Sequence, residues 1–206
     1  MGQDKAFVNH EGRLLADIAR GALLEAGATE VLSVGGDLAR LSELGFVAIA
    51  DDTPGEGPLG GLLTALRVVA DRWVVVLSCD LPYASAETVR ELVSQAGEDT
   101  DAVVPLLDGR PLPTHAVWRR DCRELLGAAF AAGERRLTAS LEVLRVRRVA
   151  VRHPGTLLDV DTPGDLRGTP AGGGPGAGLL AGAPVVRGPA ERLRPPGAEP
   201  VRGAER

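Results

Sequence analysis

Aromatic residues make up only 3% of this 206-residue sequence, and cysteine occurs twice. With so few aromatic rings, the core has to be built from Leu, Val, Ala and Ile, which the hydrophobic content of 44% allows. Neither Cys79 nor Cys122 lies in a CxxC or His-rich metal-binding spacing. We therefore expect free thiols and a reducing compartment.

The sequence also lacks long apolar runs and an excess of basic residues. No run reaches the length of a transmembrane helix, and no signal-peptide core follows Met1. The net charge is −5, so no overall basic character indicates nucleic-acid binding. We expect a cytoplasmic protein with no nucleic-acid or membrane partner. A polyanion such as a nucleotide would need a metal ion or local Lys and Arg residues to supply positive charge.

The composition changes sharply near residue 167. Residues 168–206 contain ten Gly and seven Pro, which disfavour both helices and strand ladders. We expect this segment to be a disordered tail, and residues 1–167 to form one domain.

Residues 1–167 alternate between strand and helix signals. Short β-rich runs predict strands at 31–34, 46–50, 73–80, 101–106 and 147–151. Amphipathic patterns predict helices at 13–27, 60–72 and 86–97. This alternation indicates an α/β fold with a mostly parallel sheet flanked by helices. Ligands of such sheets bind at the carboxyl ends of the strands.

Acidic residues follow three of these predicted elements. They are Asp51 and Asp52, Asp80, and the later pair Asp159 and Asp161. Parallel neighbouring strands would bring these carboxylates to one edge of the sheet. Carboxylates without Cys or His ligands suit Mg²⁺, which prefers oxygen donors and often bridges one or two carboxylates to a phosphate.

Turn chemistry is the competing interpretation for some of these aspartates. An Asp after a strand often forms only an Asx-turn or caps the next helix, and we favour this for Asp51 and Asp52 judged alone. Asp80 follows a very apolar strand and precedes Pro82, where an acid is costly unless it is paired or liganded. Helix capping explains residues 162–165 and leaves Asp159 and Asp161 open.

Two glycine-containing segments complete the candidate site. In "GEGPLGGL" (55–62), Pro58 fits a first helical turn and Gly57 leaves backbone N–H groups uncovered, so a flat ligand such as a base could approach. An ordinary tight loop is an equal alternative. In "MGQDK" (1–5), Lys5 can serve as a point charge on phosphates, although judged alone it is a surface lysine.

Taken together and in this order, the motifs resemble the molybdenum cofactor guanylyltransferases, within the nucleotidyltransferase fold of the sugar-nucleotide pyrophosphorylases. The matching segments are "MGQDKA", "DDTPGEGPLGGL", "VVLSCDLPY", "DGRPLPTHAVWRR", "AGERRL" and "LLDVDTPGDL". The resemblance covers residues 1–167. The family pattern begins with a strand and a Leu-Ala-Gly-Gly loop that this sequence does not show before Met1. We interpret the domain as N-terminally truncated with its first strand missing, either through a start codon assigned too late or through a true truncation.

The resemblance implies roles for individual residues. Lys5 matches a catalytic lysine that contacts the nucleotide phosphates, and Asp80 matches the catalytic Mg²⁺ ligand close to the nucleotide. Asp51 matches an acidic nucleotide-binding residue, with Asp52 as the alternative register. Gly57, Pro58 and Leu59 match the loop beside the guanine base. Asp159 and Asp161 match a position pair at which aspartate is frequent in cytidylyl relatives.

The reaction that the resemblance implies is Mg²⁺-dependent transfer of GMP from GTP to molybdopterin, with release of pyrophosphate. GTP and molybdopterin would be the partners, together with molybdoenzymes or their chaperones. Three alternatives stay open: CTP in place of GTP, another phosphate acceptor, and an inactive nucleotide-binding or adaptor protein.

Overall fold

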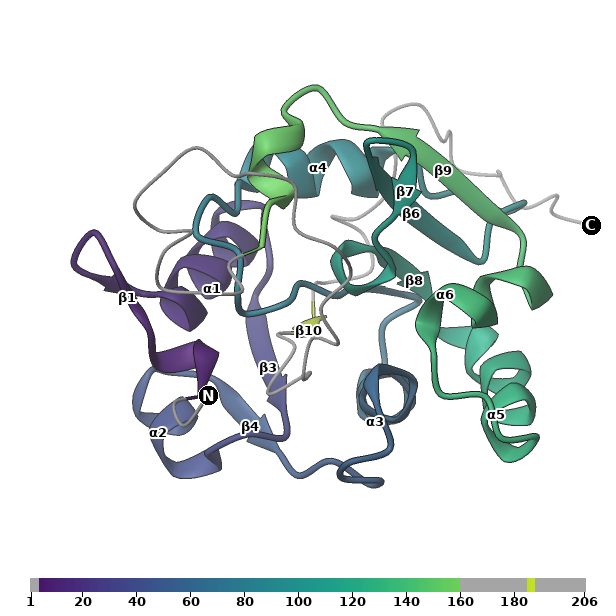
Figure 1. Ribbon diagram of the computed structural model, residues 1–206, viewed down its shortest axis with the longest axis horizontal. Helices are drawn as coiled ribbons and strands as arrows, with labels where there is room; N and C mark the ends of the chain where they lie inside the picture. The colour runs from purple at the N-terminus through teal and green to yellow at the C-terminus, as the bar shows by residue number, and fades with distance from the viewer. Residues whose placement is uncertain (1–3, 160–184, 188–206) are drawn as a thin grey trace, which may run out of the picture.

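The computed structural model describes residues 4–159 and 185–187, and its helices lie on both sides of the strands (Figure 1). The α-helices are α1 (Leu15–Glu25), α2 (Leu38–Glu43), α3 (Pro58–Val68), α4 (Ala86–Ser94), α5 (Arg123–Ala131) and α6 (Leu137–Ser140). The strands are β1 (Asn9–His10), β2 (Arg13–Leu14), β3 (Glu30–Val34), β4 (Val47–Ile49), β5 (Trp73–Val75), β6 (Ala102–Leu107), β7 (Arg110–Pro111), β8 (Val117–Arg119), β9 (Val146–Ala150) and β10 (Val185–Arg187). Short 3₁₀ turns are η1 (Lys5–Phe7), η2 (Pro113–His115), η3 (Arg120–Cys122), η4 (Leu141–Val143) and η5 (Pro154–Leu157).

The main strands form two sheets. One has the order β10-β3-β4, with β3 and β4 parallel; the other has the order β5-β8-β6-β7, with β9 paired in parallel to β6. Strand β8 is antiparallel to both β5 and β6, so β5, β6 and β9 all run in one direction. A separate hairpin of β1 and β2 precedes α1.

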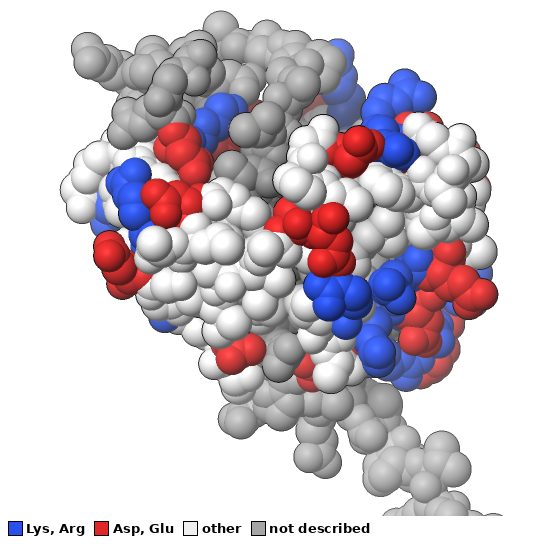
Figure 2. Space-filling model, turned by 90° about the horizontal axis from the view of Figure 1, so that it is seen from below, with Lys and Arg blue, Asp and Glu red and all other residues white. Residues whose placement is uncertain are grey.

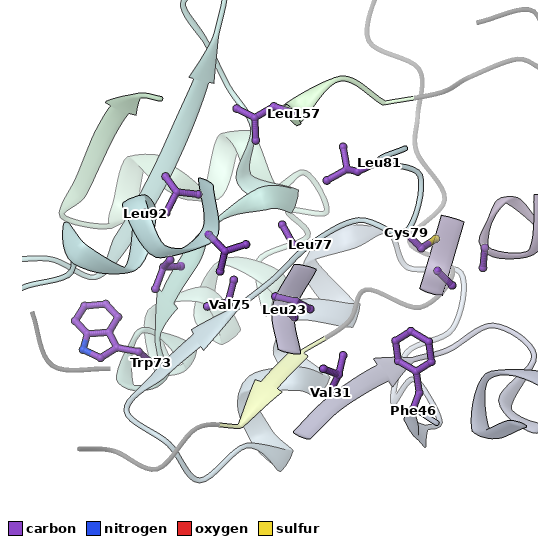
Figure 3. Close-up of a cluster of buried hydrophobic side chains, with 14 of the residues drawn as sticks. Leu23, Val31, Phe46, Trp73, Val75, Leu77, Cys79, Leu81, Leu92 and Leu157 are labelled. Atoms are coloured by element: carbon purple, nitrogen blue, oxygen red, sulfur yellow. The ribbon is translucent and has the colours of Figure 1, made fainter. Parts of the chain in front are cut away.

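Side chains alternate between the two faces of the strands, as expected when helices cover both sides. On one face, Val31 and Val75 pack with Leu23 of α1 and Leu92 of α4; Figure 3 shows this cluster. On the other face, a second buried cluster joins strand residues to α3 and α5, with Leu32, Val74, Trp118, Leu66 and Leu126 among its members. Each helix is therefore held by an apolar stripe against the sheet rather than by its intrinsic propensity.

The predicted α/β fold is confirmed, and each predicted strand and helix is present. The strand predicted over 73–80 is shorter than expected, since β5 covers only Trp73–Val75. Local signals worked where predicted: Gly27, with φ +111°, follows the end of α1, and Pro58 opens α3. The helices α2, α5 and α6 and the strands β1, β2, β7, β8 and β10 were not expected. Strand β8 has only three residues and is separated from its partner β6 by β7 and η2, so no simple hairpin pattern predicts it.

Most of the predicted tail, together with the predicted domain boundary at residue 167, lies outside the described residues. Within the tail, residues 185–187 form β10, which pairs antiparallel with β3 in the register Val186↔Val31. Strand β10 also lies close to β5, so it stands between the two sheets (Figure 1). The two consecutive β-branched valines of this segment favour a strand, and the disordered tail stays a prediction for the rest of residues 168–206.

Candidate active site

Lys5 is placed by a short turn that the first described residues form. Asp4 caps η1, its Oδ1 accepting a hydrogen bond of 3.1 Å from the Ala6 N–H. The side chains of Ala6 and Phe7 are buried, which anchors the turn to the core. From this turn the Lys5 Nζ reaches the carboxylate of Asp80, 3.3 Å from Oδ2.

Asp80 lies just beyond β5, at the end of a chain segment whose residues are almost all buried. Its own side chain is only 7% exposed, and such a carboxylate needs partners. Lys5 supplies one, and the Ser78 hydroxyl supplies another by donating to Oδ1. Because Ser78 lies two residues before Asp80, the strand end carries a ready-made donor for its own acid.

His115 backs this strand end from η2, the turn before β8. Its Nδ1 accepts a long hydrogen bond of 3.5 Å from the Ser78 N–H. Burial lowers the pKa of His115, and the nearby carboxylates of Asp80 and Asp159 oppose that shift. Asp80 and Asp159, from separate parts of the chain, therefore lie close enough to act on one imidazole, which is neutral at pH 7.

Asp51 and Asp52 follow β4 and have different surroundings. Asp51 Oδ1 accepts a hydrogen bond from the Thr53 N–H at 3.0 Å and lies 3.1 Å from the Thr64 hydroxyl. This is the Asx-turn arrangement, and it links the loop to α3. Asp52 is half exposed and forms a two-pronged ion pair with Arg67 of α3, at 2.6 and 2.9 Å.

Gly57 is the N-cap of α3, with φ +82°, and Pro58 and Leu59 begin the helix. No side chain caps this helix end. Gly57 is exposed, whereas Pro58 has no N–H, Leu59 is fully buried and the Gly60 N–H donates to the Gly57 carbonyl at 3.1 Å. Gly60 follows in the same turn, where a Cβ would overlap the Thr53 hydroxyl. The first turn of α3 therefore carries no side chain at either Gly57 or Gly60.

The structure brings together Lys5 and Asp80 among the predicted site residues, and the charge of Asp159 acts on His115. Asp51 and the turn at 57–59 form a second group, at the start of α3, and among the described contacts none joins it to Asp80. Asp161 lies outside the described residues. Sequence reasoning missed Ser78 and Thr64; only Ser78, in "LSCD", carried a local signal.

The chemistry of these donors fits a hard cation. Asp80 and Ser78 offer oxygen atoms, the ligand type that Mg²⁺ prefers. Within residues 4–159 and 185–187, no group of three or more His, Cys, Asp or Glu side chains is arranged to hold a metal ion. A cation at Asp80 would therefore need further oxygen ligands from water and from a bound phosphate.

Charges on the neighbouring surface are mixed rather than of one sign. Figure 2 views the molecule from below and shows basic and acidic side chains next to one another. Arg67 forms an ion pair with Asp52, and Arg135 forms one with Glu56. None of the helices in the described part of the chain is long and apolar enough to cross a membrane.

The same fold is found in solved structures of other proteins. A solved structure of molybdopterin-guanine dinucleotide biosynthesis protein A from Archaeoglobus fulgidus matches 81% of this chain and 88% of its own, at 24% identity and a TM-score of 0.60. A 2-C-methyl-D-erythritol 4-phosphate cytidylyltransferase from Thermus thermophilus matches 79% of this chain and 90% of its own, at 22% identity and a TM-score of 0.61.

The sequence comparison is more specific. The MobA-like NTP transferase domain family matches residues 1–149, and the chain belongs to this family. Relatives named "Probable molybdenum cofactor guanylyltransferase" come from Bacillus licheniformis and Bacillus subtilis; each is 30% identical over 80% of this chain, covering 87% and 85% of the relative. The chain is thus a nucleotidyltransferase.

Proposed function

We propose that this nucleotidyltransferase transfers GMP from GTP to molybdopterin in a Mg²⁺-dependent reaction. The observation that carries the proposal is the ion pair between Lys5 and Asp80 at the end of β5. A cationic amine beside a buried carboxylate provides one group for phosphate and one for a metal ion. The names of the Bacillus relatives favour GTP and molybdopterin as the substrates.

In the proposed reaction, an oxygen of the terminal phosphate of molybdopterin attacks the α-phosphorus of GTP. A new P–O bond forms, the bond from the α-phosphorus to the bridging oxygen breaks, and pyrophosphate leaves with the electron pair. Bound Mg²⁺ would neutralise the developing negative charge. The acceptor phosphate is already ionised, so the protein needs no covalent nucleophile.

The residues of the chain would orient the two substrates and neutralise the negative charge of the phosphates. Asp80 would hold the metal ion, and the hydrogen bond from the Ser78 hydroxyl would fix the orientation of its carboxylate. Lys5 would contact the nucleotide phosphates, and the backbone of the turn at Gly57, Pro58 and Leu59 would face the base, with Asp51 shaping the loop. Positioning and charge neutralisation of this kind account for most of the catalysis in phosphoryl and nucleotidyl transfer.

The proposal is tested by incubating the purified chain with GTP, MgCl₂ and molybdopterin and measuring pyrophosphate and the dinucleotide product. We expect both products to form together and to disappear when EDTA is added. Turnover with CTP and none with GTP would exclude guanylyl transfer. A clear rise in Tm with GTP and Mg²⁺ but no turnover would favour a binding protein over an enzyme.

A further inference from the structure

Arg135 connects the turn after α5 to the loop that leads into α3. Its Nε pairs with the carboxylate of Glu56, 79 positions earlier in the chain. Its Nη1 donates to the backbone carbonyls of Phe130 and Glu134, at 2.8 and 2.9 Å. The guanidinium also stacks over the ring of Phe130, with 4.0 Å between Cζ and the ring centroid. A single side chain thus fixes two loops that are distant in sequence.

The same region packs directly on the first turn of α3. A Cβ on Gly57 would lie 3.3 Å from the backbone carbonyl oxygen of Arg135, closer than most real contacts. A Cβ on Gly60 would lie 3.6 Å from the Phe130 ring. Close packing at both glycines means that movement of Arg135 would move the turn that contains Gly57, Pro58 and Leu59.

The turn that carries Arg135 is itself rigid. The Glu134 carboxylate accepts hydrogen bonds of 2.9 Å from the N–H groups of Arg135 and Arg136. These bonds lower the pKa of Glu134 to about 2, so the carboxylate stays ionised at any pH at which the enzyme would work. The backbone of Arg135 is therefore held in place by the hydrogen bonds of this turn.

The loop at 55–57, in contrast, has two glycines with positive φ, Gly55 and Gly57, and its helix has no side-chain cap. Glycine at such positions leaves the loop many conformations unless contacts elsewhere hold it. We propose that Arg135 is a positioning residue that holds the turn at 57–59 in the shape that receives the base of the nucleotide. This inference rests on the proposed function, because that function places the base at this turn.

Arg136 offers a matched control, because it is the next residue and carries the same charge. Its side chain is 77% exposed, and its described side-chain contact is with Glu134 at 3.4 Å, not with the loop before α3. Arg136→Ala removes a cation from the same turn without touching Glu56 or Gly57.

The experiment compares the wild-type chain with Arg135→Ala, Arg135→Lys, Glu56→Gln and Arg136→Ala. We expect Arg135→Ala to raise the Kd and the KM for GTP about tenfold with kcat changed less than about threefold, because preorganisation of the turn is lost. Arg135→Lys, which keeps the charge but not the planar fork, should fall between these values. Glu56→Gln should raise KM severalfold, and Arg136→Ala should match the wild type.

Hydrogen exchange of the amides at 55–60 tests the positioning without any ligand. Exchange should be faster in Arg135→Ala and unchanged in Arg136→Ala. Equal exchange in all variants, or a lower Tm and kcat with an unchanged KM, would overturn the positioning role. If the wild-type chain binds no nucleotide, both the proposed function and the role of Arg135 in nucleotide binding are refuted. If the wild-type chain turns over normally and Arg135→Ala has an unchanged KM, only the inference about Arg135 is refuted.

Discussion

Lys5 and Asp80 are 75 positions apart in the chain, yet the Lys5 Nζ lies 3.3 Å from Asp80 Oδ2. The carboxylate is buried and its other oxygen already accepts from Ser78. The Asp80 carboxylate pairs with the Lys5 ammonium group in this structure, and it would bind a metal ion in the proposed reaction.

Asp80→Asn should abolish turnover while the fold is kept. The amide has the same shape but no charge for a metal ion, so we expect kcat to fall by a factor of about 10² or more. The measurement is pyrophosphate release, with circular dichroism to verify the fold. Asp108→Asn is the control, since Asp108 lies in the exposed β6–β7 turn with φ +50°, which Asn also adopts. Normal turnover in Asp80→Asn would refute a metal role for this residue.

Lys5→Gln should separate the two cations that compete for Asp80. Without the ammonium group, Mn²⁺ or Mg²⁺ alone should bind more tightly, because no protein cation has to be displaced. Nucleotide should bind about ten times more weakly, since the point charge on the phosphates is lost. Calorimetric titrations with the metal ion alone and with GTP measure the two effects. Weaker binding of both would contradict competition at Asp80.

Gly60→Ala should destabilise the protein through one identifiable contact. The new methyl group would overlap the Thr53 hydroxyl, which is buried and has no hydrogen-bond partner among the described residues. We expect a loss of about 1–3 kcal/mol in the free energy of unfolding.

Thr53→Ala in the same chain should restore most of the stability lost in Gly60→Ala, because it removes the obstructing atom. Gly127→Ala in α5 is the matched control: no atom lies within 4 Å of its Cβ position, so the substitution should stabilise the helix by about 0.5–1 kcal/mol. Denaturant unfolding of Gly60→Ala, Thr53→Ala, the double variant and Gly127→Ala measures these differences. Additive losses in the double variant would show that the clash is elsewhere.

Asp101 should make stability depend on pH. Hydrogen bonds from the Arg145 side chain, at 2.6 and 3.0 Å, lower the pKa of Asp101 in the folded protein. Since the folded pKa is below the unfolded value, the stabilisation is present above about pH 4 and is lost as the pH falls through the folded pKa. Asp101→Asn should therefore cost about 2 kcal/mol at pH 7 and much less near pH 2. A pH-independent difference in unfolding free energy would argue against the ion pair as its source.

Two truncations test the strand formed by residues 185–187. A chain ending at residue 188 keeps β10, whereas one ending at residue 183 lacks it. We expect the shorter chain to have a Tm several degrees lower, because the edge of β3 loses its partner. Equal Tm values would show that β10 contributes nothing to stability.

The sequence reveals the fold through its apolar runs and the strand-end aspartates. The run at 73–80 and the helical patterns predict β5, α1, α3 and α4 directly, since each element buries its own apolar residues. Strands β8 and β10 escape prediction because three-residue strands take their conformation from distant partners, not from local pattern. The many Gly and Pro residues around β10 also lower the average strand propensity of the segment, despite the two valines of β10.

The candidate site can be predicted from the sequence only where local patterns determine it. Motif spacing singles out Lys5 and Asp80, but only the folded chain shows that they touch. The position of Asp51 directly after a strand predicts its Asx-turn. Thr64 and Arg135 act across 13 and 79 positions, on Asp51 and Glu56 respectively, and no local rule connects residues so far apart.

The pairing of β10 with β3 also constrains the order of events during synthesis. The two strands are about 150 residues apart, so β3 leaves the ribosome on the order of ten seconds before its partner exists. Throughout that interval the backbone groups on that edge of β3 are open to other nascent chains. Cells producing this enzyme should therefore yield more of the assembled protein when translation is fast or when a chaperone covers that edge.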